Sequence, residues 1–441
     1  MAAELAPVRT EAEAALVAAF AESRAMLPGG PEVARSRELA FKSFERSGLP
    51  HRRIEEWKYT DLRALMRGAK PLAAAPDSAA KQAAHAAGAA LAGIHAHRLV
   101  FVDGRYVPEL SAAAAIPGVT VKSLGQALAQ GDTEVTARLA ATPTDVALAL
   151  NTAFMTDGAV IRVGKGVVVA DPIHLVFVHS GAQASMAFTR SLVVVEADAQ
   201  VTLAETHEGP AGLAYQSNTA LDLVVGDGAK VDHVKIGCEG DAALHVATLV
   251  ATVGERAELR DFTFTLGGGV TRNQLFVTCA GIASELTLAG ASLLRGQEHA
   301  DTTLVLDHAV GGCKSRELFK SVLDGESRGV FQGKIVVRPD AQRTDARMMT
   351  QALLLSEEAE ADNKPELEIF ADDVQCGHGA TAGALDDNLK FYLMARGISE
   401  TEAEALLIQA FVGEAIETIT HHGVRDALMF AALRWLGQRT P

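Results

Sequence analysis

The feature that most constrains the fold is a short phrase that returns at a nearly constant interval through the middle of the chain. Each copy follows an apolar run and a turn, and consists of a small residue, a polar residue and an apolar residue that opens the next run. The phrase occurs at Ala199-Gln200-Val201, Ala229-Lys230-Val231, Ala257-Glu258-Leu259 and Ser284-Glu285-Leu286. From one copy to the next the steps are 30, 28 and 27 residues. The next copy that we assign, Arg328-Gly329-Val330, lies 44 residues further on, which indicates an inserted loop or a different register there.

The runs between these copies are short, rich in valine and closed by Gly, Asp or Asn, a pattern typical of β-strands. A repeat of this size, built from short strands and turns, predicts a solenoid, because each coil buries its apolar side only by stacking on its neighbours. A β-sandwich also has many short strands, but nothing requires its turns to recur at a constant interval. We therefore predict a stacked parallel β-helix over residues 93–383.

Helical patterns flank this region on both sides. Over residues 1–92, apolar residues recur at spacings of three and four, and Thr10 with Glu13 forms a capping box. Over residues 384–441 the helical spacing returns, with Gly397 at the end of the first helix. A stack of coils has two ends and open edges that need cover. We therefore predict an N-terminal and a C-terminal helical domain, and the second has more apolar surface than it can bury by itself.

Charge, cysteines and hydropathy restrict the partners. The chain has 40 Lys plus Arg against 55 Asp plus Glu, so an extended basic surface for nucleic acid is not expected. Acidic residues interrupt the apolar segment near the N-terminus, unlike in a signal peptide, and no apolar stretch is long enough to cross a bilayer. The four scattered cysteines form no CxxC pair and no disulfide spacing. We expect a cytoplasmic protein with neither a membrane nor a nucleic-acid partner, and without a self-contained metal site.

The standard nucleotide-binding and catalytic motifs are incomplete. The two nearest phosphate-loop candidates, beginning at Gly158 and Gly329, have five and three residues between their glycines where the motif has four. HExxH and GxSxG are absent, and the closest dinucleotide phrase, Gly377 to Gly383, is one residue too long. ATP binding through a phosphate loop is therefore not expected, and no standard catalytic motif is complete.

One segment, residues 371–383, carries residues with metal-binding chemistry. Cys376 and His378 are two apart, so in an extended segment both side chains point to one face and place a thiolate donor beside an imidazole. Two ligands do not complete a metal site, which needs about four. Either the pair binds metal with ligands from a distant coil or another chain, or Cys376 is a buried thiol beside a hydrogen-bonded histidine.

Several longer phrases match a known family in their residues and in their order. They are Phe331-Gln332-Gly333-Lys334, Gln351 with Leu353-Leu354-Leu355-Ser356, Lys364-Pro365-Glu366-Leu367-Glu368-Ile369, Cys376-Gly377-His378-Gly379-Ala380-Thr381 and Phe391-Tyr392-Leu393-Met394-Ala395-Arg396-Gly397-Ile398. With these phrases the chain resembles the SufB/SufD family of iron-sulfur cluster assembly proteins. The Trp57-Lys58-Tyr59-Thr60 segment and the Cys-x-His-Gly-Ala-Thr form resemble the SufD branch of that family.

The resemblance implies a right-handed parallel β-helix and a scaffold subunit that is not itself an enzyme. It implies a heterodimer with a SufB-like subunit through the β-helix, and binding of a SufC-like ABC ATPase through the C-terminal helices. A homodimer of the isolated chain stays an alternative. No permanent cofactor is implied, only transient iron or an iron-sulfur cluster shared with the partner.

The resemblance also implies roles for particular residues. By motif, His378 is a metal ligand, for iron or a cluster, at the SufB interface, and Cys376 lies beside it. The residues expected to support ATPase docking are Tyr392, Leu393, Arg396 and Gly397. Gly377 stands where relatives often have Ser, which should not change ligation.

Two other protein classes also have β-helices. An enzyme acting on acidic polysaccharides would need secretion and a basic or calcium-binding groove, and the sequence indicates neither. A self-assembling β-helix structural protein would stack end to end, which the long C-terminal helical region with its motifs argues against.

Overall fold

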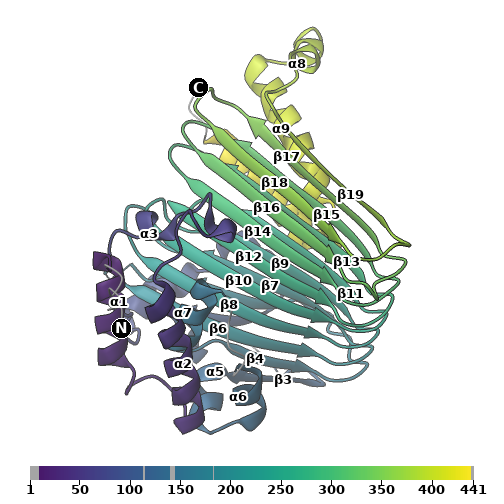
Figure 1. Cartoon of the computed structure of the whole chain (residues 1–441). Helices are drawn as coiled ribbons and strands as arrows, with labels where there is room; N and C mark the ends of the chain where they lie inside the picture. The colour runs from purple at the N-terminus through teal and green to yellow at the C-terminus, as the bar shows by residue number, and fades with distance from the viewer. Residues whose placement is uncertain (1–8, 113–114, 140–144, 182, 439–441) are drawn as a thin grey trace, which may run out of the picture.

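The computed structural model is a column of strands with helices at both ends (Figure 1). The structure describes residues 9–112, 115–139, 145–181 and 183–438. The predicted capping box is present, since Thr10 accepts from the Glu13 backbone and the Glu13 carboxylate accepts from the Thr10 backbone. The elements before the first strand are α1 (Glu11–Ser23), α2 (Pro31–Ser47), η1 (Glu55–Trp57), α3 (Leu62–Leu65), α4 (Ser78–Ala83), η2 (Ala84–Ala86) and η3 (Ala89–Leu91).

The first part of the predicted β region is not purely β. Its elements are β1 (His97–Val102), β2 (Arg105–Tyr106), η4 (Pro108–Leu110), β3 (Val119–Ser123), α5 (Leu124–Ala129), α6 (Thr133–Leu139), α7 (Val146–Phe154) and β4 (Ala159–Val163). The β-helix that we predict over residues 93–383 is therefore interrupted by helices in its first part, of which α7 is the longest. This segment is apolar on nearly every side, so periodicity does not separate a buried helix from a buried strand. Asp145 decides the outcome locally, because its carboxylate caps the helix at Leu148 N, 3.0 Å away.

From β5 onward the chain forms a regular solenoid, of about 8 turns. The strands are β5 (Ile173–Val178), β6 (Met186–Val195), β7 (Gln200–Glu208), β8 (Gln216–Val225), β9 (Lys230–Cys238), β10 (Leu244–Val253), β11 (Glu258–Thr265), β12 (Val270–Cys279), β13 (Glu285–Leu294), β14 (His299–His308), β15 (Lys314–Leu323), β16 (Arg328–Val337), β17 (Asp345–Leu354), β18 (Glu360–Ile369) and β19 (Gln375–Gly383). Odd-numbered strands from β5 onward form one sheet, which also contains β1 and β2. Even-numbered strands from β4 onward form the other sheet, which also contains β3. Neighbouring strands within each sheet are parallel from β5 and β6 onward, which confirms the predicted parallel β-helix.

The repeated phrase marks the start of each coil in the odd-numbered sheet. Its four assigned copies open β7, β9, β11 and β13. The fifth assignment was wrong, because Arg328 opens β16 in the opposite sheet. The true next copy opens β15, where Lys314 pairs with Glu285 of β13. It was missed because Cys313 and Ser315 stand where earlier copies have a smaller residue and an apolar residue.

The space between the two sheets is the main hydrophobic core. Alternate residues of each strand point inward, and the inward positions are largely Leu, Val, Ile and Ala. Leu259, Leu288, Leu304 and Ile335 show the pattern, since each is completely buried. Burying one such side chain stabilises the fold by roughly 1.5–3 kcal/mol. The stacking of coils is therefore what supplies a core to strands that have no core of their own.

The Trp57 segment joins the N-terminal helices to the flank of the β-helix. The guanidinium of Arg272, on β12, lies 3.8 Å from the centre of the Trp57 ring. Arg272 is fully buried, and it donates to Asp301 at 2.5 Å and to the backbone carbonyl of Glu56 at 2.6 Å. Thr60 donates to the same Asp301 carboxylate. A buried ion pair is tolerated when further hydrogen bonds support it, as those from Arg272 to Glu56 and from Thr60 to Asp301 do, so the segment has an architectural role in this chain.

Three helices follow the last strand: α8 (Asp387–Met394), α9 (Glu400–Ile416) and α10 (His422–Gly437). Gly397 ends the first of them in the left-handed region, with φ of +86°, as predicted. Ile408, Val412 and Leu428 are buried against the outer face of the odd-numbered sheet. Figure 1 shows α9 along this sheet and α8 standing clear of the strands. Within the described part of the chain, no helix is long and apolar enough to cross a membrane.

Candidate functional site

The open end of the solenoid carries the residues singled out by sequence. In the described residues β19 pairs only with β17, and β18 only with β16, so these two strands form the outermost coil. No further coil formed by the described residues covers them. Backbone groups and inward-facing side chains at this end are therefore available to another molecule.

Cys376 and His378 both face the lumen at this end. Cys376 pairs with Ala346 and His378 with Met348, and both β17 partners are buried in the core. Paired residues of parallel neighbours point to the same face, so the shared face predicted from their spacing is present. The His378 imidazole is exposed and makes no hydrogen bond with the described residues. Cys376 is half-buried, and burial raises the pKa of its thiol.

A line of inward positions leads from His378 into the interior. Below His378 lies Met348, and below Met348 lies Glu317 of β15. Glu317 is buried, and neither of its carboxylate oxygens has a hydrogen-bond partner among the described residues. Burial raises the pKa of Glu317 to about 8. A carboxyl group that is neutral near physiological pH therefore lies two coils beneath the outermost one.

We expect Glu317→Gln to remove a pH dependence of stability. The folded state keeps this proton up to about pH 8 while the unfolded chain loses it near pH 4.5, so ionisation lowers the free energy of unfolding as pH rises between these values. Between about pH 5 and about pH 8, the variant should gain on the order of 3 kcal/mol relative to the wild type. Denaturant titrations at several pH values measure the difference. The control is Glu32→Gln, at an exposed position of α2, and equal pH profiles for wild type and Glu317→Gln would contradict the assignment.

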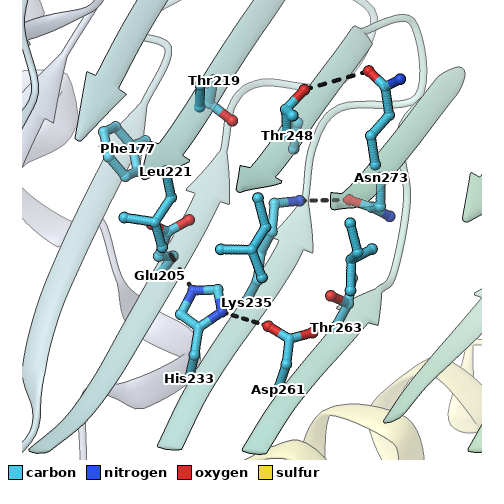
Figure 2. Close-up of a pocket in the computed structure, with 15 residues that line it drawn as sticks. Phe177, Glu205, Thr219, Leu221, His233, Lys235, Thr248, Asp261, Thr263 and Asn273 are labelled. Carbon is cyan, nitrogen blue, oxygen red and sulfur yellow. Dashed lines mark hydrogen bonds and ion pairs between the residues drawn. The ribbon is translucent and has the colours of Figure 1, made fainter. Parts of the chain in front are cut away.

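Deeper in the lumen lies a network of buried charges (Figure 2). His233 Nδ1 is 2.6 Å from Asp261 Oδ1, and Lys235 Nζ donates to Asn273 Oδ1 at 2.8 Å. Burial would lower the pKa of His233, but the bond to Asp261 raises it, whereas burial lowers the pKa of Lys235 to about 8. Glu205 lies on the other side of His233, at 4.0 Å. Because opposite charges are paired within the network, it can remain ionised away from water.

A neighbouring group of side chains has the residue types of a metal site. Ligand atoms of His207, Glu239 and His245 lie within 4.8 Å of one another and all three side chains are buried. His207 and His245 lie on different coils, on β7 and β10, so their spacing along the chain does not indicate that they meet. The Glu239 carboxylate accepts from Tyr215 at 2.5 Å and lies 2.9 Å from His245, and His207 bonds Glu205. These partners occupy the ligand atoms, so the group is best described as part of the buried network.

A third cluster brings together two of the four scattered cysteines and a histidine. Cys279, His308 and Cys313 place one ligand atom each within 4.8 Å of one another, and all three are completely buried. Cys279 and His308 are paired neighbours on β12 and β14, and Cys313 lies in the turn that follows β14. Sequence separation hid the cluster, because residues 29 apart become neighbours only once the length of a coil is known.

The residues expected to dock an ATPase lie on α8 and just after it. No residue of this helix is buried, and Phe391 and Tyr392 are 72% and 54% exposed. Arg396 lies over the Tyr392 ring at 3.4 Å and donates to the Tyr392 carbonyl at 3.1 Å. Leu393 is half-buried and Gly397 is exposed. The structure thus places the four expected residues together on one exposed, partly aromatic helix end.

Comparison with known proteins covers nearly all of this structure. The model of the SufBD protein N-terminal region matches residues 10–175, and that of the SufBD core domain of SUF system FeS cluster assembly matches residues 177–411. An iron-sulfur cluster assembly SufBD family protein of Synechocystis is 34% identical over 385 residues, which is 84% of each chain. The iron-sulfur cluster assembly protein SufD of Escherichia coli is 32% identical over 399 residues, or 90% of each chain. SufD of Bacillus subtilis is 27% identical over 288 residues, or 64% of each chain.

Together with the β-helix, these matches define the class: the chain belongs to the SufBD family of SUF iron-sulfur cluster assembly proteins. Within that family it is a homologue of SufD, and its similarity to the Escherichia coli protein extends over nine-tenths of that protein's length. The resemblance indicated by the C-terminal phrases and the Trp57 segment is confirmed.

Proposed function

We propose that this chain is a non-enzymatic scaffold subunit that pairs with a SufB-like subunit, so that a nascent iron-sulfur cluster is built where the two meet. The observation that carries the proposal is the position of Cys376 and His378 on the outermost coil, facing an uncovered lumen. A partner β-helix seated on this end would add its own ligands to theirs. Two ligands from one chain and the rest from another would complete a site that neither chain holds alone.

The chemistry of the two side chains suits transient binding of iron. A free imidazole nitrogen and a thiol are ligands for ferrous iron and for iron-sulfur clusters. The raised pKa of Cys376 means that metal must displace a proton from the thiol, so loading would strengthen as pH rises. Iron here is the material being assembled rather than a resident cofactor, and exposure of His378 leaves a route for release.

The same proposal assigns the C-terminal helices to a SufC-like ABC ATPase. Exposed aromatic and aliphatic side chains on α8 suit a protein interface, since large exposed apolar groups often mark partner sites. We place this assembly in the cytoplasm, because its thiols must stay reduced for this chemistry.

Co-purification tests the proposed function directly. The chain is expressed with a SufB-like and a SufC-like protein, and the complex is isolated and reconstituted anaerobically with iron and sulfide. A ternary complex that acquires iron and sulfide is the expected result. A chain that forms only homodimers and recruits neither partner would contradict the proposal.

A further inference from the structure

Two columns of buried residues run along the edge of the lumen where even-numbered strands end and odd-numbered strands begin. The first column ends the strands of the even-numbered sheet, each member paired with the next: Val195, Val225, Val253, Cys279, His308 and Val337. The second column lies just before the strands of the odd-numbered sheet: Ala199, Ala229, Ala257, Ser284, Cys313 and Thr344. Every member of both columns is nearly or completely buried, so the two columns belong to the same interior.

The pattern of the two columns breaks at one place only along these coils. Valine fills the first column on both sides of Cys279 and His308, and small residues fill the second on both sides of Cys313. If these positions required only packing, valine would satisfy the first column, as it does in the flanking coils, and alanine or a small hydroxyl residue would satisfy the second. Instead, two thiols and an imidazole replace them in adjacent coils. The substitutions meet at one point, although Cys279 lies 29 residues before His308 along the chain.

The geometry at that point is suited to a metal ion. The three ligand atoms lie within 4.8 Å of one another, and a tetrahedral zinc site requires sulfur atoms about 3.8 Å apart. His308 Nε2 lies 3.1 Å from Ser315 Oγ, and Nδ1 of this completely buried ring has no hydrogen-bond partner among the described residues. Ser284 Oγ donates to Cys313 Sγ at 3.2 Å. An unpartnered nitrogen in a dry interior is costly unless something binds it.

The chemistry of the side chains agrees with this geometry. A divalent cation that binds here would displace the thiol protons of Cys279 and Cys313 to solvent, which would leave two thiolates to balance its charge.

We propose that Cys279, His308 and Cys313 form an interior binding site for a thiophilic divalent cation, Zn²⁺ or Fe²⁺. Two sulfur ligands and one nitrogen favour these ions over Mg²⁺ and Ca²⁺, which require oxygen ligands. The Ser284 hydroxyl or a water molecule is close enough to the cluster to serve as the fourth ligand. The site is independent of the proposed interface, because all of its protein ligands come from this chain.

Metal titration of the full-length protein tests the site. Reduced, metal-free protein is titrated anaerobically with Co²⁺, whose thiolate charge-transfer absorption reports sulfur ligation, and Zn²⁺ or Fe²⁺ is then added in competition. We expect saturation at about one cobalt per chain and displacement by at least one of the two cations. The deletion variant is Cys279→Val with Cys313→Ala, which installs the valine and alanine that the two columns have in earlier coils, at Val253 and Ala257. It should lose the thiolate absorption and bind at least about tenfold more weakly.

Two controls guard against an unspecific effect of thiol removal and against misfolding. Cys238→Ala removes a thiol that belongs to neither proposed site and should leave the cobalt thiolate absorption unchanged. The single variant Cys313→Ala provides a second measurement, since Zn²⁺ should raise the thermal unfolding midpoint of the wild type and not of this variant. Thiolate absorption that persists in the double variant would overturn the proposal. So would a wild type that binds none of the three ions while forming a Cys279–Cys313 disulfide in air, which would identify a redox pair instead.

Discussion

Replacing His378 with alanine is expected to lower the iron and sulfide content of the assembled complex while leaving its assembly intact. The imidazole is exposed and hydrogen-bonds no described residue, so its removal breaks no contact of the fold. If it is a ligand, iron binding should weaken by at least about tenfold. Iron and sulfide analysis of the reconstituted complex measures the effect, alongside thermal unfolding of the isolated chain.

The matched control for this variant is His85→Ala. His85 is also exposed, but lies in the N-terminal region, far along the chain from the outermost coil. Cys376→Ala should give a loss in the same direction as His378→Ala, since the two side chains share one face. Iron content that is unchanged in both variants would remove the interface site from this chain. Loss of SufB-like partner along with iron would instead assign His378 to pairing.

Replacing Phe391 and Tyr392 together with alanine is expected to abolish detectable binding of the ATPase. Both rings are exposed on a helix with no buried residue, so their loss should not destabilise the chain. Aromatic side chains at the centre of an interface commonly contribute 2 kcal/mol or more, which corresponds to about thirtyfold in affinity. Pull-down and a binding titration with purified SufC-like protein measure the change. Met26→Ala, at an equally exposed apolar position near α1, is the control.

Truncation after about residue 385 should also abolish ATPase binding, but it is a less direct test. Val412, Leu428 and Trp435 are buried against the sheet and within the C-terminal helices, so the truncation exposes a hydrophobic cluster. We expect the β-helix to persist in the truncated chain with reduced stability. Undiminished ATPase binding by either the double variant or the truncated chain would show that docking lies elsewhere.

Most of the architecture could be predicted because it follows from periodic patterns. The recurrence of Ala199, Ala229 and Ala257 indicated coils, and Gly397 marked the end of a helix. The errors occurred where local patterns are ambiguous. The apolar segment that forms α7 is compatible with helix or strand, and Ser315 interrupted the phrase that opens β15.

The shared face of Cys376 and His378 could be predicted because the two residues are close in sequence. In an extended strand, side chains two apart always share a face, so the joint orientation of Cys376 and His378 needed no tertiary information. The same reasoning failed for Glu317. Its carboxylate is buried without a hydrogen-bond partner among the described residues because of the side chains that stack above and below it in neighbouring coils. That reasoning failed also for the charges around His233, which come from several coils.

The sequence by itself determined the kind of coil, the helical ends and the family, because each rests on short-range patterns or on phrases read along the chain. Only the tertiary structure decided which residues meet across coils. An error of one residue in the register of a strand turns each of its side chains to the opposite face, so contacts between distant segments require the exact stacking. Cys279, His308 and Cys313 are the clearest case. Four scattered cysteines argued against a metal site, and the stacking of β12 on β14 brought two of them together around a buried histidine.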